Sequence, residues 1–98
     1  MFHELFFFYR EAAYLNLALV AEAAVAGRVV TLLIEADRQV PGRMDAATGR
    51  IELDDLADPE VDDLLDDLGE LVLKMRGQVV VVPSERMPTR TGIAAIYR

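Results

Sequence analysis

Cysteine and tryptophan are absent from this chain of 98 residues, and histidine and serine occur once each, as His3 and Ser84. The lack of cysteine excludes disulfides, thiolate zinc sites and thiol catalysis, and fits a cytoplasmic protein. A lone serine outside any Gly-x-Ser-x-Gly pattern cannot be paired with a general base here. No glycine-rich phosphate-binding motif occurs either. We therefore expect no catalytic activity, no metal site and no cofactor.

Lysine and long apolar runs are also scarce. Lys74 is the only lysine among 10 basic residues, and 17 acidic residues leave a net charge of −7. Because nucleic acids are bound through Lys and Arg clusters that displace counterions, this balance favours a protein over RNA as the partner. The most apolar stretch, Leu5–Ala26, is interrupted by Arg10 and Glu22, whereas a membrane-spanning helix needs about 20 nearly uninterrupted apolar residues. No membrane span or signal peptide is expected.

The chain is rich in apolar residues, at 53%, which suffices for one globular domain over residues 1–98. Alanine and leucine predict a first helix from Glu4 to Ala26, which Gly27 ends. Phe6 and Phe7 belong to an aromatic segment, residues 1–9, that is very apolar for the exposed start of a lone domain. Either this segment packs on a partner, or it fills the core, or the chain is cut from a longer one.

A β-branched run over Val29–Ile34 predicts a central strand. Residues 38–54 then form an irregular loop and hairpin excursion. Within it, Pro41–Gly42 marks a turn, and Asp45–Gly49 is typical of a hairpin turn with glycine in a left-handed conformation.

The clearest helix is predicted to start with Asp58 as its N-cap and Pro59 in its first turn, and to end at Gly77. Its apolar face is formed by Val61, Leu64, Leu65, Leu68, Val72 and Met75, and its acidic face by Asp62, Asp63, Asp66, Asp67 and Glu70. Asp62 and Asp66 are candidate partner-binding residues. The alternative is an ordinary solvated helix face.

Two more strands are predicted at Val79–Val82, as a buried strand, and at Ile93–Tyr97, with a loop over Pro83–Thr91 between them. A helical crossover should make the first two strands parallel, so the loops that follow them should leave the same sheet edge. Four arginines in these loops are candidates to grip phosphates or carboxylates of a partner: Arg38, Arg43, Arg86 and Arg90. The alternative is ordinary pairing with the acidic residues among them, Glu35, Asp37 and Glu85.

The last segment, Gly77–Arg98, combines a glycine, an apolar strand, an Arg/Pro/Thr loop and a strand that ends in Gly-Ile-Ala-Ala-Ile-Tyr-Arg. This order resembles the closing strand–loop–strand of the third domain of the archaeal and eukaryotic class-one release factors. Val25–Ile34 resembles the helix-to-strand passage that opens that domain. From Arg10 to Arg98 the chain is most similar to the bacterial archaeo-eukaryotic release factor family.

The resemblance implies a three-layer α/β/α sandwich with a small mixed sheet, as in the kink-turn-binding ribosomal proteins. It also implies a non-catalytic role in translation, because this domain of the release factors contacts the translational GTPase. Val82–Glu85 resembles the corresponding loop of the kink-turn binders. Their Gly-x-Asn-Glu stretch for RNA contact is replaced here by the apolar Leu17–Val20, and the Gly-Gly-Gln motif of peptide release is absent.

We therefore expect a protein-interaction module of a release-factor-like protein. Its partner would be a translational GTPase, the ribosome or sister domains. The alternatives are a small RNA-binding module that uses the Arg-bearing loops and a structural homodimer.

Overall fold

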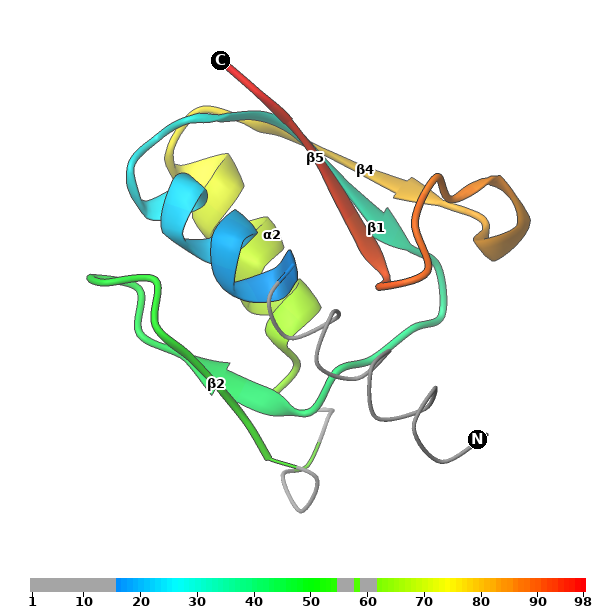
Figure 1. Cartoon of the computed structure of the whole chain (residues 1–98), viewed down its shortest axis with the longest axis horizontal. Helices are drawn as coiled ribbons and strands as arrows, with labels where there is room; N and C mark the ends of the chain where they lie inside the picture. Colours follow the sequence, from blue (N-terminus) through cyan, green and yellow to red (C-terminus); the bar gives the residue numbers. More distant parts are fainter. Residues whose placement is uncertain (1–15, 55–57, 59–61) are drawn as a thin grey trace, which may run out of the picture.

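The computed structural model describes residues 16–54, 58 and 62–98, which are coloured in Figure 1. Residues 16–25 are helical and form the first helix of the described chain. The elements that follow are β1 (Val29–Glu35), β2 (Gly42–Met44), β3 (Ile51–Leu53), α2 (Leu64–Lys74), β4 (Gln78–Val82), the 3-10 turn η1 (Ser84–Arg86) and β5 (Ile93–Tyr97). The aromatic segment with Phe6 and Phe7 lies outside the described residues.

β1 is the central strand of a three-stranded sheet in the order β4-β1-β5. β4 runs parallel to β1, with Val80 opposite Leu33, and β5 runs antiparallel, with Ala94 opposite the same Leu33. The valines and isoleucines of these strands suit a pleated surface. The three predicted strands, the central place of β1 and its parallel pairing with β4 are confirmed, as is the α/β class with a small mixed sheet.

Both helices pack on one face of this sheet and share one core with it (Figure 1). α2 contacts β1 and β4. The largest fully buried side chains come from both helices and from the sheet: Leu17, Val20, Leu32, Leu64, Leu65, Leu68, Val72 and Ile93. The apolar stripe predicted for the second helix is therefore its buried face over residues 64–72. Leu71, which the prediction omitted, is buried, whereas Met75 is 38% exposed.

Each helix ends in a Schellman motif, which satisfies the last carbonyl groups of the helix. Gly27 takes the left-handed position after the first helix, with a φ of 71°, and Arg76 takes it after α2, with a φ of 68°. The N–H of Gly77 donates to the carbonyl oxygen of Val72 at 2.8 Å, and the N–H of Arg76 to that of Leu73 at 3.1 Å. Gly77 thus follows the left-handed residue of α2 instead of supplying it.

β2 and β3 form the predicted hairpin, on the side of the helices away from the sheet (Figure 1). The N–H of Gly49 donates to the carbonyl oxygen of Asp45 at 2.8 Å. Gly49 has a φ of 77°, and a Cβ there would lie 2.8 Å from the carbonyl oxygen of Ala21, so the turn rests directly on the first helix. The described layers therefore run sheet, helices, hairpin. No described helix covers the outer face of the sheet, where an α/β/α order would place one.

The start of α2 differs from the prediction. Its N-cap is Asp63 instead of Asp58: Asp63 Oδ1 accepts hydrogen bonds from the N–H of Leu65 at 3.1 Å and of Val40 at 3.0 Å. One carboxylate thus caps the helix and holds the excursion against it. The predicted turn at Pro41–Gly42 is wrong, because Pro41 forms a β-bridge with Asp63 and Gly42 begins β2.

Candidate functional site

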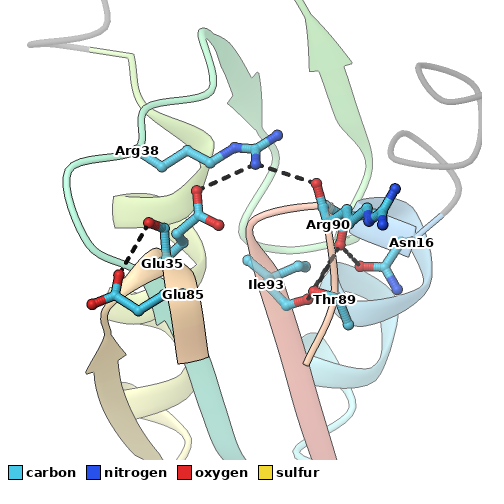
Figure 2. Close-up of polar contacts among 9 residues, drawn as sticks. Asn16, Glu35, Arg38, Glu85, Thr89, Arg90 and Ile93 are labelled. Carbon is cyan, nitrogen blue, oxygen red and sulfur yellow. Dashed lines mark hydrogen bonds and ion pairs between the residues drawn. The ribbon is translucent and has the colours of Figure 1, made fainter. Parts of the chain in front are cut away.

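Arg38 follows β1 and is held by the loop that precedes β5 (Figure 2). Its Nη1 donates to Glu35 Oε2 at 3.3 Å and to the carbonyl oxygen of Arg90 at 3.2 Å. Its side chain also covers Gly92, where a Cβ would lie 3.0 Å from both Cδ and Nε of Arg38. The loop after β1 and the loop before β5 therefore meet at one end of the sheet. The guanidinium group of Arg38 is engaged within the chain, in the way that the ordinary-pairing alternative expects.

Threonine hydroxyls fix the same loop from its other side (Figure 2). Thr91 Oγ1 donates to Asn16 Oδ1 at 2.9 Å, which ties the loop to the first helix. Thr89 Oγ1 donates to the carbonyl oxygen of Ile93 at the start of β5. The loop before β5 is therefore held by a local bond to Ile93 and by bonds from two distant segments, at Asn16 and Arg38.

The predicted group of four arginines does not form at this end of the sheet. Arg43 lies on β2, on the far side of the helices, where its Nε is 3.7 Å from Asp62 Oδ2. Arg86 is exposed in η1, directly after β4. The hairpin carries Arg43 away from Arg38, although only four residues separate the two along the chain. A sequence pattern gives the order of such loops but not the side of the helices on which each lies.

The acidic face of α2 is smaller than predicted. Asp63 is buried, with 7% exposure, and Asp62 pairs with Arg43, whereas Asp66 is exposed. Burial first, and repulsion from Glu70 next, raise the pKa of Asp67 above its usual range. This crowding of carboxylates gives the start of α2 a negative potential. Among residues 16–54, 58 and 62–98, no three acidic or histidine side chains come together as metal ligands.

Exposed apolar side chains were not foreseen from the sequence. β4 was predicted to be buried, yet it is an edge strand, and Val81 is 64% exposed. Leu73 of α2 is 59% exposed, and in β5 Ile96 and Tyr97 are 56% and 47% exposed. An uninterrupted apolar run indicates a strand but does not distinguish a central strand from an edge strand. The sequence of β4 alone therefore does not reveal that its side chains are exposed.

The outer face of the sheet collects part of this apolar surface. The register places Val80, Leu33 and Ala94 in one row across the three strands, and Thr31 beside Ile96 in the next row. Side chains that are opposite in register point to the same face of a sheet. The central row of the outer face is thus apolar across all three strands, with Gln78 and Thr31 beside it on one side and Glu35 on the other.

In the part of the chain that the structure describes, none of the helices has the length and apolarity to cross a membrane. No protein-family model matches the chain, and no curated protein matches it.

Proposed function

We propose that this chain is a non-catalytic protein-interaction module that works in translation, similar to the third domain of the class-one release factors. The observation that carries the proposal is the apolar row across the outer face of the sheet. Its central row joins Val80, Leu33 and Ala94, and Ile96 beside this row is 56% exposed. Apolar side chains gathered on one face are typical of surfaces that bind another protein.

The translational setting rests on the resemblance of Gly77–Arg98 to the closing strand–loop–strand of the release-factor domain. Val80 and Ile96 of the outer face, which are 37% and 56% exposed, both lie within this segment. The surface and the resemblance therefore concern the same part of the chain. A translational GTPase or a ribosomal protein is the partner class that the resemblance supplies.

The arginines favour a protein over RNA as the partner. Arg38 donates to Glu35 and to the carbonyl oxygen of Arg90, and Arg43 pairs with Asp62. A phosphate would have to displace these contacts before it could be gripped by both side chains. The net charge of −7 adds an unfavourable long-range field for a polyanion.

Co-sedimentation with purified bacterial ribosomes, at low and at moderate salt, tests the proposal. We expect the chain to appear in the ribosomal pellet at moderate salt. Ile96→Lys should weaken this retention at least tenfold, or about 1.4 kcal/mol, because the new charge would be buried in an apolar contact. Leu19→Lys is the matched control, since Leu19 is 62% exposed on the first helix, away from the sheet's outer face.

Two results count against the proposal. If the chain stays in the supernatant at both salt concentrations and purified translational GTPases do not bind it, the translational role is overturned. Equal loss of binding in both variants would show that the outer face is not the contact surface.

A further inference from the structure

β4 is an edge strand, and none of the described residues pairs with its outer edge. Its sequence, Gln-Val-Val-Val-Val, has four consecutive β-branched residues and no charge. Residues of this kind have high strand propensity. A charged side chain or a proline within an edge strand normally prevents it from pairing with another strand. β4 has neither, so its composition favours the addition of a strand.

We propose that β4 is a homodimer interface, at which two copies of this chain pair antiparallel along β4 about a twofold axis at Val80. Val80 then faces Val80 of the second copy, Val79 faces Val81, and Gln78 faces Val82. A twofold axis joins the same surface of both copies, so one symmetric ladder satisfies both strand edges. The inference shares with the proposed function only the premise that the exposed apolar surface binds protein.

The position of α2 favours a second copy as the occupant. A Cβ on Gly69 would lie 3.3 Å from Ile34 Cδ1 and 3.9 Å from Val79 Cγ1, so α2 lies above the gap between β1 and β4. Neighbouring strands are about 4.8 Å apart, which places α2 and its copy about two strand spacings, or roughly 10 Å, apart. Packed helices have axes about 8–10 Å apart. Pairing along β4 therefore brings the two helices into contact.

The exposed apolar side chains at this edge become buried in the pair. Val81 lies opposite Ile34 in register, on the helix-covered face of the sheet, yet it is 64% exposed. Asp66, Gly69 and Leu73 are spaced by three and four residues and form one row along α2. Gly69 in this row faces the sheet, and Leu73 is 59% exposed. A second copy of α2 would cover both Leu73 and Val81.

The charges along α2 are self-complementary in this arrangement. Asp66 lies in the acidic first turn and Lys74 in the basic last turn. Gly69 lies between Val79 and Ile34, the partner of Val81, and so at the level of Val80 along the strand. The twofold axis at Val80 therefore passes beside Gly69 and Glu70, and Asp66 and Lys74 lie at nearly equal distances along α2 on either side of it. Each Asp66 therefore meets Lys74 of the second copy. Glu70 faces its own copy and is the one unfavourable pair, so Glu70→Gln should tighten the dimer.

Sedimentation of the full chain at about 100 μM, a concentration that detects dimers with Kd values well above micromolar, gives the first test. We expect a mass twice the 10.9 kDa of one chain. Val81→Lys should give a monomer, because it puts a charge into the paired edge. Ile96→Lys, on the opposite edge strand, should remain dimeric. A monomeric wild-type chain, or a dimer equally disrupted by both substitutions, overturns the proposal.

A charge exchange gives the second test. Asp66→Lys and Lys74→Asp should each weaken the homodimer at least tenfold, with the helical circular dichroism signal unchanged. An equimolar mixture of the two variants should recover a dimer, because both ion pairs re-form between unlike chains. A mixture no tighter than either variant alone refutes the helix pairing. Val81→Lys tests dimerisation and Ile96→Lys tests ribosome binding, so either proposal can fail while the other stands.

Discussion

Asp63 joins the start of α2 to the excursion, so its removal should clearly lower the stability of the described fold. Its carboxylate is buried and accepts two main-chain hydrogen bonds, from Leu65 at the start of α2 and from Val40 in the excursion. Loss of an N-cap costs about 0.5–2 kcal/mol. A hydrogen bond to a charged group contributes about 1.5–3 kcal/mol. We therefore expect Asp63→Ala to lower the free energy of unfolding by about 2–4 kcal/mol.

This loss is a large share of the roughly 5–15 kcal/mol that stabilises an ordinary domain. In a chain of this size each kcal/mol shifts Tm by about 4–8 °C, so Tm should fall by roughly 8–32 °C. Urea and thermal unfolding, both followed by circular dichroism, measure the two quantities. Asp63→Asn retains an oxygen acceptor for both N–H groups and should lose about half as much or less.

The matched control for Asp63 is Asp66, an exposed aspartate in the first turn of the same helix. Asp66 caps no main-chain group in one chain, and its favourable interaction with the helix dipole is worth under about 1 kcal/mol. Both variants are compared in the Val81→Lys background, where the proposed Asp66–Lys74 contact between copies does not form. If Asp63→Ala costs no more than Asp66→Ala, the carboxylate does not hold the excursion to α2. A loss in Asp63→Asn as large as in Asp63→Ala would refute the role of the oxygen acceptor.

Two further predictions concern the ends of α2. Arg76 occupies a left-handed position that costs a non-glycine residue about 1–2 kcal/mol, so Arg76→Gly should raise the free energy of urea unfolding by about 0.5–1 kcal/mol after the entropy of glycine is deducted. Gly27→Ala at the equivalent position of the first helix should lower it, and effects of the same sign at both positions would contradict this reasoning. The raised pKa of Asp67 means that its carboxylate is harder to ionise in the folded than in the unfolded protein. This penalty is present at pH 7 and disappears as the pH falls below the ordinary aspartate value of about 4. Asp67→Asn should therefore raise the urea midpoint at pH 7 and lose this advantage near pH 3.5, whereas equal gains at both values would exclude a titration effect.

Local patterns were sufficient to predict most of the elements. The runs Val29–Ile34 and Ile93–Tyr97 predicted strands because β-branched residues between turn signals have few other stable conformations. The hairpin at Asp45–Gly49 was predictable because its glycine must adopt a positive φ. The start of α2 was not, because Asp58 and Asp63 are both good N-caps by residue type. Contact with Val40, which is distant in sequence, decides between them.

The surface was less predictable than the elements, since exposure depends on which neighbour an element acquires. Four consecutive valines in β4 read as a buried strand, yet its place at the sheet edge leaves Val81 exposed on the face that α2 covers elsewhere. The same holds for Leu73, because its spacing from Gly69 places it on the side of α2 next to the edge strand β4 and away from the core. An isolated chain gains nothing from large apolar side chains at such a place, whereas each one that becomes fully buried contributes about 1.5–3 kcal/mol. The proposed second copy would bury both side chains, and the charge exchange between Asp66 and Lys74 tests that contact separately from the outer face of the sheet.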